Sequence, residues 1–359
     1  MQTKVNEKLF DGQSIYIGID CHKKNWTVTI LGEQYEHKTM SQNPDPDILA
    51  SYLKRNFPGA DYSAVYEAGF NGFYPCRKLR QLGIHCNVIH AADVPTRQKD
   101  KLQKMDPVDS RKLARSLRSR EFEPIHIPDQ SLESDRALVR QRFRVMRDVT
   151  RTKARIRSLL FQFSISVPDQ FTLGQTRSWS KLYINWLKGL HTEHESLKQT
   201  LDNYIRIGEL QRKELLDVNR QVRSLSQTDA YRGNYNLLIS IPGIGFLTAM
   251  TFLVQIGDIR RFERLDDLCD YVGLVPMMHG SGERMYTGKL INRGRKELKT
   301  MIIEAAWESV RLDPALMSKF NELTLRMNKN KAIIRISRKL VSRMRYVLIN
   351  QEPYRLGII

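Results

Sequence analysis

The sequence predicts a mixed α/β domain over residues 1–125, a long helical arm over 126–230 and a mainly α-helical domain over 231–359. The first domain is indicated by short apolar runs with strand character, which follow one another and then alternate with helical patterns. The rest is interpreted as helical because the stretch from Ser131 to Phe163 contains no helix breaker, and amphipathic patterns recur towards the C-terminus.

The first domain is expected to begin with an antiparallel meander. The run Tyr16–Asp20 and the alternating run Trp26–Ile30 are typical of strands, and Gln34–Thr39 is a candidate third strand. The next elements are expected in this order: a helix over 47–56, a strand over 62–67, a helix over 73–82 and a strand over 84–89. A helix then begins at Asp106, and the proline-containing segment 123–128 indicates a domain boundary.

Four carboxylates in this domain form the candidate site. Asp20 and Glu67 each end an apolar run, at the carboxyl end of a predicted strand, where open sheets bind their ligands. Asp106 and Asp109 share one face of a predicted helix because they are three residues apart. Converging carboxylates repel one another unless a cation lies among them, and Mg²⁺ and Mn²⁺ favour oxygen ligands. The alternative is that the two helical acids only interact with the helix dipole.

The net charge of +19 indicates a polyanionic partner, most often nucleic acid, with general surface basicity as the alternative. No apolar stretch approaches the roughly 20 residues needed to span a bilayer. The first residues lack the apolar core of a signal peptide. The four cysteines show no C-x-x-C spacing. We therefore expect a cytoplasmic protein with reduced thiols, no zinc site and no membrane partner.

The predicted helix from Ser131 to Phe163 is unusually basic. Nine basic residues and one acid lie between Arg136 and Arg157. An ordinary coiled coil mixes both signs, so this helix is expected to lie on nucleic acid; a solvated basic face is the alternative. Its candidate contacts are Arg140, Arg144, Arg147, Arg151 and Arg155, and its expected heptad seam is Met146, Val149, Ile156, Leu160 and Phe163.

A second long helical pattern runs from Leu197 to Leu225. Two long helices joined by a connector form an antiparallel helical arm, here expected to be a coiled coil. Such an arm either dimerises or supports a bound strand, and the sequence leaves both roles open.

The segment Ser240–Gly245 joins two apolar helical patterns through a Pro-Gly-x-Gly turn. Such a turn exposes backbone N–H groups at a helix N-terminus, where phosphate binds favourably. The segment resembles the helix-hairpin-helix motif, which holds the DNA backbone without reading sequence, and Gly243 and Gly245 are its candidate contacts. Ordinary packing of two helices explains the same turn, but the basic charge of the chain favours the DNA interpretation.

A polar stretch with several glycines, from His279 to Arg295, is the second candidate for chemistry, because polar loops often carry function. It contains two hydroxyl groups suited to attack a phosphate, those of Ser281 and Tyr286. Residue chemistry alone does not decide between them. The candidate cations for the phosphate are Lys289, Arg293 and Arg295.

Six motif fragments follow one another along nearly the whole chain. They are Ile17–Lys23, Glu67–Gly69, Asp106–Ala114, Ile241–Gly245, Tyr271–Pro276, and Ser281–Gly282 with Gly288 and Arg293–Gly294. In this order they resemble the IS110/IS1111-type transposases, the DEDD transposases of bacterial insertion sequences. Each fragment alone is weak evidence, but six in the right order make a chance resemblance improbable. Met105 departs from the pattern, because many relatives carry a small polar residue before the first helical acid.

The resemblance implies a RuvC-like domain of the RNase H type, whose acids, here Asp20, Glu67, Asp106 and Asp109, hold Mg²⁺. It also implies that a serine of the C-terminal domain, here Ser281, attacks the DNA phosphate. Members of this family are recombinases that a structured bridge RNA guides to donor and target DNA, and they work as oligomers with composite sites. For this chain we therefore expect a homo-oligomer, a dimer or a tetramer, at the nucleoid of a bacterial or archaeal cell.

Two other functions fit the residues. One is a metal-dependent nuclease or resolvase of the RuvC type, in which water attacks the phosphate and Ser281 has no catalytic role. The other is a non-catalytic nucleic-acid-binding protein that uses only the helical turn and the arm. Replacing Ser281 separates the first alternative from a serine recombinase, and replacing Asp106 separates the second.

Overall fold

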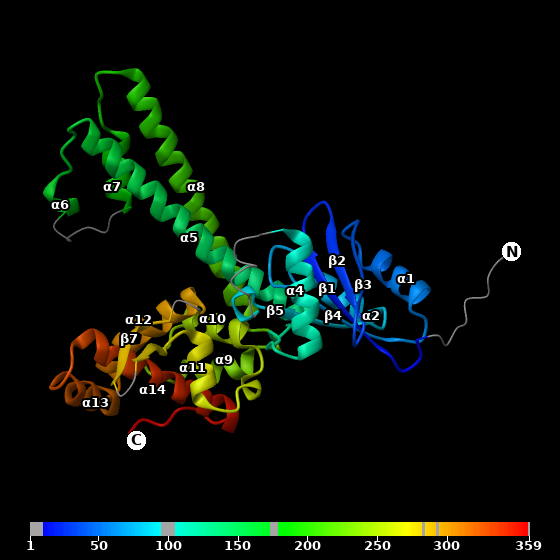
Figure 1. Cartoon of the computed structure of the whole chain (residues 1–359). Helices are drawn as coiled ribbons and strands as arrows, with labels where there is room; N and C mark the ends of the chain where they lie inside the picture. Colours follow the sequence, from blue (N-terminus) through cyan, green and yellow to red (C-terminus); the bar gives the residue numbers. More distant parts are fainter. Residues whose placement is uncertain (1–9, 95–104, 173–178, 282–283, 292–293, 358–359) are drawn as a thin grey trace. The chain divides into compact units, whose positions relative to one another are not determined.

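The computed structural model divides the chain into two compact units, Met1–Ile127 and Pro128–Ile359, which are taken separately below (Figure 1). It describes residues 10–94, 105–172, 179–281, 284–291 and 294–357, with the backbone alone over the strand residues of 278–287. No helix in these ranges is long and apolar enough to cross a membrane.

The first unit is built on a mixed five-stranded sheet with the strand order β3-β2-β1-β4-β5. β1 (Ser14–Cys21), β2 (Trp26–Leu31) and β3 (Glu36–Gln42) form an antiparallel meander, and β4 (Asp61–Glu67) and β5 (His85–Ile89) continue the sheet parallel to β1. Parallel neighbours need crossovers, which contain α1 (Pro46–Asn56) and α2 (Tyr74–Gln81). The predicted mixed α/β layer and its meander are confirmed.

Helices cover both faces of this sheet, because the central strands are apolar on both sides. On one face, Ile17 of β1 belongs to a buried cluster with Leu53 of α1 and Leu79 of α2. On the other face, Val65 of β4 packs with Leu113 of α4 (Asp106–Ser119). A short 3-10 helix, η1 (Ala91–Asp93), follows β5. The sheet is therefore a middle layer, with α1 and α2 on one face and α4 on the other.

The second unit begins with two long helices, α5 (Gln130–Gln162) and α8 (Glu195–Leu225), which lie side by side (Figure 1). The chain passes between them through α6 (Asp169–Thr172) and α7 (Lys181–Lys188). This end of the helical pair has its own buried cluster, which includes Ile156, Leu160, Trp179, Leu187 and Ile205.

The expected heptad seam of α5 is wrong at two of its five positions. The Met146 side chain is 39% exposed and that of Phe163 is 46% exposed. Val145 and Thr152 are buried instead. Thr152 Oγ1 donates a hydrogen bond to Gln211 Oε1 of α8 at 2.8 Å, so a buried polar pair occupies part of the contact between the two helices. A pattern of apolar residues alone does not reveal such a pair.

The larger core of the second unit surrounds α10 (Phe246–Ile256), in which every residue from Thr248 to Ile256 is buried. α5, α9 (Arg232–Ile239) and α12 (Lys296–Leu312) pack on α10, and α14 (Lys329–Asn350) packs on α9 and α12. The remaining helical elements are η2 (Ile259–Arg261), α11 (Leu265–Val272) and α13 (Pro314–Thr324).

The polar stretch after α11 is not the loop that its composition suggests. It contains two antiparallel strands, β6 (Pro276–Ser281) and β7 (Arg284–Leu290). Glycine and polar residues are poor strand formers, which hides the pair from a propensity count. The strand pair starts just after α11 and ends just before α12, and there the backbones of Gly273 and Gly294 touch: a Cβ on Gly294 would lie 2.5 Å from the Cα of Gly273.

Candidate functional site

Asp20 and Glu67 end adjacent parallel strands in the first unit. Ile19 of β1 pairs with Tyr66 of β4, so the next residues along each strand, Asp20 and Glu67, are level with each other. Side chains alternate between the faces of a sheet, so Asp20 points to the same face as Gly18, and Glu67 to the same face as Val65. This is the face that α4 covers.

A close approach of α4 to β1 brings the helical acids to this edge. A Cβ on Gly18 would lie 2.1 Å from the carbonyl oxygen of Ser110 and 2.4 Å from the nitrogen of Ala114, so only glycine fits beneath the helix. Ser110 is buried, and its Oγ shares a hydrogen bond of 2.8 Å with Thr29 Oγ1 of β2. Asp106 and Asp109 lie in the first turn of this helix, one turn before the point of closest packing.

His22 stands between two of the acids. Its Nε2 lies 3.2 Å from Asp20 Oδ2 and 3.4 Å from Asp106 Oδ1. One ligand atom from each of these three residues falls within 4.8 Å of the others, which is a spacing suited to a metal ion. From the sequence alone His22 is a candidate for proton transfer, although lone histidines are more often structural or solvent-facing. Its position two residues after a strand-end acid was the signal that it lies beside the site.

The electrostatics connect all four carboxylates. Burial raises the pKa of Asp20 above its ordinary value; His22 opposes this shift, and the charges of Asp106 and Asp109 add to it. Burial likewise raises the pKa of Glu67, with Lys112 opposing and with Asp109 and Asp20 adding. The two strand-end acids are therefore close enough to the acids of α4 for their charges to interact. Their mutual repulsion is the unfavourable term that a bound cation removes.

The donor set fits a hard divalent cation. Asp20, Glu67, Asp106 and Asp109 offer carboxylate oxygens, the ligands that Mg²⁺ and Mn²⁺ favour. Within the described ranges, no Lys or Arg forms an ion pair with any of the four. Two of these acids are half-buried and close to like charges, which is an unfavourable state without a counter-charge.

Ser281 belongs to the other unit. It is the last residue of β6, where its backbone pairs with Arg284 of β7, and its side chain is outside the described part of the structure, as is that of Tyr286. Arg293 also lies outside the described residues. The structure thus brings Asp20 and Asp106 within ligand distance of each other in one unit, with Glu67 and Asp109 close enough to influence them electrostatically, and places the candidate nucleophile on a strand pair of the second unit.

Arg295 lies beside a group of cations around Tyr271. Its guanidinium carbon is 5.3 Å from the centre of the Tyr271 ring, and that of Arg261 is 4.6 Å from it. Burial would raise the pKa of Tyr271, but Arg295, Arg136 and Arg261 outweigh that effect and lower it below its ordinary value. Sequence reasoning missed Arg261 and Tyr271, although Tyr271 opens one of the motif fragments.

The two glycines of the candidate DNA-binding turn have different surroundings. Gly243 has a φ of +88°, and a Cβ there would lie 2.4 Å from Ser309 Oγ of α12, so packing and backbone conformation both require glycine. Gly245 precedes α10, is exposed, and would meet no atom within 4 Å. Arg223 of α8 lies over Phe246, the first residue of α10, at 4.2 Å from the ring centre.

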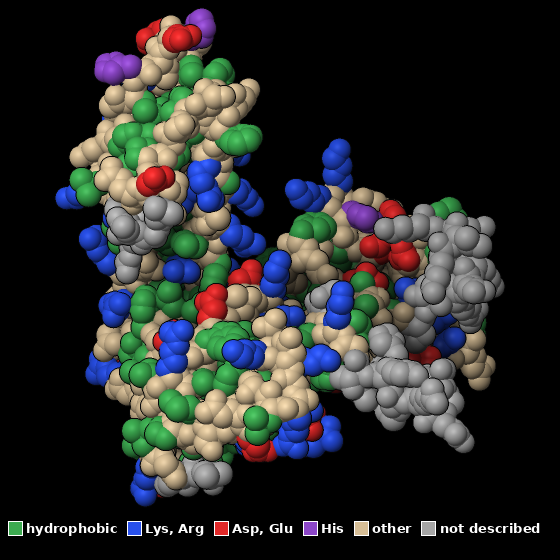
Figure 2. Space-filling view, turned by 90° about the vertical axis from the view of Figure 1, so that its left-hand side faces the viewer, with side chains coloured by type: hydrophobic (Ala, Val, Ile, Leu, Met, Phe, Trp, Pro, Cys, Tyr) green, Lys and Arg blue, Asp and Glu red, His purple; other side chains and the backbone are tan. Residues whose placement is uncertain are grey.

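The basic candidates of α5 are mostly on the surface. Arg144 and Arg155 are exposed and form no ion pair with any residue that the structure describes, whereas Arg151 pairs with Asp148 at 2.7 Å. Arg147 is 3.6 Å from Glu297, and Arg140 Nη2 donates to Gln255 Oε1 at 3.5 Å. Figure 2 shows Lys and Arg side chains at many points of the surface that it draws.

Arg136, the first of the nine basic residues of α5, is not a surface residue. It is 4% exposed, and its guanidinium donates to the carbonyl oxygens of Val254 and Gln255 at 2.5 and 2.9 Å. These carbonyls belong to the last turn of α10, where a cation is favourable. A count of charges along α5 therefore overstates the number available to nucleic acid.

Comparison with known proteins identifies the family. A model of the DEDD transposases of the IS110 type matches residues 17–165, and a model described as the transposase IS116/IS110/IS902 family matches residues 235–321. The transposase for insertion sequence element IS1533 of Leptospira borgpetersenii is 26% identical over 255 residues, which cover 70% of this chain and 72% of that protein.

Two further relatives extend the comparison. A putative transposase of Sinorhizobium fredii, y4rJ, is 25% identical over 91% of this chain and 90% of its own length. A pilin gene-inverting protein of Moraxella bovis is 36% identical over 33% of this chain and 37% of its own. The two family models together match more than half of the chain and include the four acids and Ser281. The protein is therefore an IS110-family transposase, a DNA transposase and recombinase of the insertion-sequence type with a RuvC-like DEDD domain.

Proposed function

We propose that this chain cuts and rejoins DNA strands for an insertion sequence, with Asp20, Glu67, Asp106 and Asp109 holding Mg²⁺ or Mn²⁺ and Ser281 acting as the nucleophile. The observation that carries the metal assignment is the convergence of the acids on one sheet edge, with mutual repulsion and no paired Lys or Arg among the described residues. The assignment of Ser281 depends on its place in the second matched segment.

The chemistry is a phosphoryl transfer in two steps. The Oγ of Ser281 forms a bond to phosphorus, its proton is lost, and one P–O bond of the strand breaks and releases a hydroxyl group. The hydroxyl of a second strand then attacks the phosphoserine and frees the serine again. One bond is made for each bond broken, so exchange needs no ATP. The bound metal would neutralise charge on the phosphate and polarise its oxygens.

The acids and Ser281 lie in different units, so a complete site needs both. We propose a composite site, assembled either within one chain or between chains of a homo-oligomer, a dimer or a tetramer. The acids alone would bind metal without exchanging strands. This arrangement prevents cutting before the assembly is complete, because neither half performs the reaction.

Several basic surfaces of the second unit support contacts with nucleic acid. Arg144, Arg147, Arg151 and Arg155 are exposed on α5, and Arg295 lies at the start of α12. Gly245 leaves the N-terminus of α10 open, with Arg223 beside it, which suits a phosphate of the kind held by a helix-hairpin-helix turn. We propose that these surfaces bind donor DNA, target DNA and a bridge RNA. We also propose that α5 and α8 form a coiled-coil arm. The protein would then act at the nucleoid of a bacterial or archaeal cell.

Trapping a covalent protein–DNA adduct tests the mechanism. Wild-type protein, bridge RNA, Mg²⁺ and donor DNA are expected to give an adduct that peptide mass spectrometry maps to Ser281. Ser281→Ala and Asp106→Asn are expected to give none. Asp61→Asn is the matched control, because Asp61 is exposed at the opposite end of the strand that Glu67 ends, and it should behave as wild type.

Each other outcome identifies a different function. An adduct at Tyr286 would make tyrosine the nucleophile. Metal-dependent cutting that survives in Ser281→Ala, with no adduct in either protein, would indicate a nuclease that uses water. Strand exchange that proceeds equally without the RNA would remove the guide from the proposal.

A further inference from the structure

A basic pocket lies in the second unit where the start of α11 meets α14, well separated in sequence from every candidate site residue of α5. Its volume is about 390 Å³, and it is lined by Leu265, Arg335, Arg338, Lys339 and Ser342. The four residues from α14 are spaced at i, i+3, i+4 and i+7, so they form one face of that helix. Three of the five lining residues are cations.

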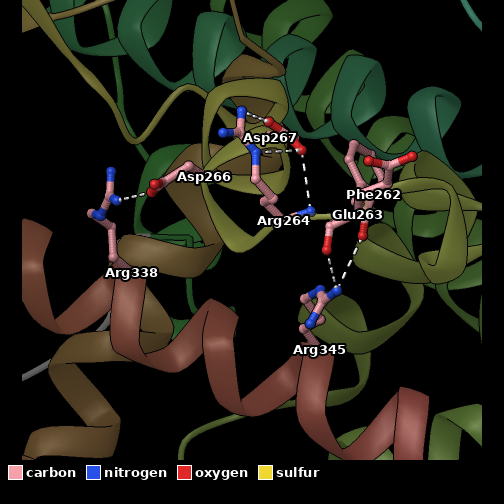
Figure 3. A network of polar contacts seen from close by, with 7 residues as sticks. All are labelled: Phe262, Glu263, Arg264, Asp266, Asp267, Arg338 and Arg345. Atoms are coloured by element: carbon pink, nitrogen blue, oxygen red, sulfur yellow. Dashed lines mark hydrogen bonds and ion pairs between the residues drawn. The ribbon is translucent and has the colours of Figure 1, made fainter.

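Two acids in the first turn of α11, Asp266 and Asp267, already have cationic partners (Figure 3). Asp266, in the first turn of α11, accepts a hydrogen bond from Arg338 Nη2 at 2.5 Å. Its neighbour Asp267 accepts from Arg264 Nη2 at 2.9 Å and from the Arg264 backbone N–H at 3.1 Å. Arg345 Nη2 donates to the carbonyl of Glu263 at 2.8 Å. The hydrogen bonds from Arg338 and Arg345 join α14 to the start of α11 and the segment before it, and among the described residues they leave Arg335 and Lys339 as the cations of the pocket without an acidic partner.

All the charged residues of α14 are basic. The helix carries seven basic residues and no acid, namely Lys329, Lys331, Arg335, Arg338, Lys339, Arg343 and Arg345. Arg335 and Lys339 are exposed, and neither forms an ion pair with a residue in the described ranges. Lys331 precedes Arg335 by four residues, so Lys331, Arg335 and Lys339 form a row with a spacing of about 6 Å. A row of cations suits an extended polyanion better than a single small anion.

The start of α11 also borders the pocket. Leu265, the first residue of this helix, lines the pocket, and the Asp267 side chain accepts the backbone N–H of Arg264 in a capping box. The free N–H groups and the dipole of a helix N-terminus favour an anionic oxygen. The Asp266 carboxylate, which would repel an anion, is neutralised by Arg338. Leu265 at the start of α11 and the three cations of α14 therefore line the same pocket.

We propose that this pocket holds a backbone phosphate of DNA, between Arg335 and Lys339 and against the start of α11. DNA is the polyanion on which the IS110 family acts, and the row on α14 continues beyond the pocket towards Lys331, as a contact with a strand requires. The proposal is independent of the serine mechanism. It adds a DNA contact on the face of α14, and such a contact positions the duplex without reading its bases.

Binding of short DNA duplexes without metal tests the proposal, with Arg335→Gln and Lys339→Gln as variants and Lys329→Gln as the matched control. Lys329 is an exposed cation of the same helix, but it lies on the side away from the pocket, six residues before Arg335. Both pocket residues are exposed and form no ion pair with a described residue, so the variants should fold; Arg338 is left intact because it is paired with Asp266 of α11. Each pocket variant is expected to weaken binding roughly eightfold at 0.1 M salt and to lower the salt slope by about 0.9, the effect of one phosphate contact.

The control variant Lys329→Gln is expected to change DNA affinity by less than a factor of two. In the pocket variants, two duplexes of unrelated sequence are expected to lose affinity equally. Equal losses in Lys329→Gln and the pocket variants would show that only general charge matters and would overturn the proposal. A loss confined to single-stranded RNA of the same length would also overturn it, because the pocket would then serve RNA. The assay contains no metal and measures binding alone, so failure here leaves the proposed recombination mechanism intact, and failure of that mechanism leaves this DNA contact intact.

Discussion

Gly18 of β1 lies directly beneath Ser110 of α4, so close that a Cβ on Gly18 would come within 2.1 Å of the Ser110 carbonyl oxygen. Ser110 is in turn held to β2 by the hydrogen bond between its Oγ and Thr29 Oγ1. This contact sets the height of α4 above the sheet. It thereby sets how far the Asp106 side chain is from that of Asp20, because Asp106 begins the helix and Asp20 follows Gly18 by two residues.

Gly18→Ala should therefore damage both stability and the metal site. Overpacking in a well-packed core costs about 1–3 kcal/mol, and here the new methyl group meets backbone atoms, which yield less easily than side chains. Urea unfolding is expected to show this loss, and metal binding is expected to weaken as α4 moves away. Gly233→Ala is the control, because a Cβ there meets nothing within 4 Å and alanine favours the helix by about 1 kcal/mol. Wild-type stability and metal affinity in Gly18→Ala would contradict the role given to this contact.

Features that depend only on neighbouring residues could be predicted from the sequence. A short apolar run located β1 and an alternating run located β2, and acids at strand ends or in a first helical turn are visible in a few residues around Asp20 and Asp106. Features that depend on distant packing were not accessible. His22 appeared isolated because Asp106, its second partner, is 84 positions away, and Arg136 was counted as a surface charge although α10 carbonyls hold it. The buried pair of Thr152 and Gln211 escaped for the same reason.

Metal binding should stabilise the first unit, and the acids should be necessary for it. A ligand at a hundredfold excess over its Kd adds about 2.7 kcal/mol to the folded state, so Mg²⁺ or Mn²⁺ should raise the Tm, and EDTA should reverse the rise. Asp106→Asn is expected to abolish this shift, whereas Asp61→Asn and Ser281→Ala are expected to keep it. An equal metal-induced shift in Asp106→Asn and wild type would refute the metal assignment.

The two glycines of the Pro-Gly-x-Gly turn should respond differently to alanine. At Gly243 the φ of +88° and the contact with Ser309 make alanine unfavourable, so Gly243→Ala should destabilise the second unit by about 1–3 kcal/mol. Gly245 has a φ of −88° and open space, so Gly245→Ala should cost only the N-cap difference between glycine and alanine, up to about 1 kcal/mol. If a DNA phosphate approaches the N-terminus of α10, the added methyl group at residue 245 should lower DNA affinity. Unchanged DNA binding in Gly245→Ala would show that the turn only packs helices.

A buried carboxylate near the C-terminus should make the stability of the second unit pH-dependent. Asp313 is fully buried; its Oδ1 accepts from the backbone N–H of Leu316 at 3.0 Å, and its Oδ2 accepts from Tyr354 Oη at 2.6 Å and from the Arg343 guanidinium. Burial would raise the pKa of Asp313, but the hydrogen bonds from Tyr354 and Leu316 and the charge of Arg343 outweigh it and lower the pKa below its ordinary value.

A pKa that is lower in the folded state stabilises the protein above the unfolded value, near pH 3.9 for aspartate, and this contribution is lost as the pH falls through the folded pKa. Asp313→Asn should cost about 3–5 kcal/mol at neutral pH, because Arg343 would be left without its partner. The difference in unfolding free energy between wild type and variant should then shrink as the pH falls below about 4.

Glu322→Gln, which removes an exposed acid from neighbouring α13, should change little at any pH, because solvent screens its ion pairs. Urea unfolding of the three proteins across this pH range measures the effect, and a difference that stays constant down to about pH 3 would show that the Asp313 carboxylate does not titrate with folding.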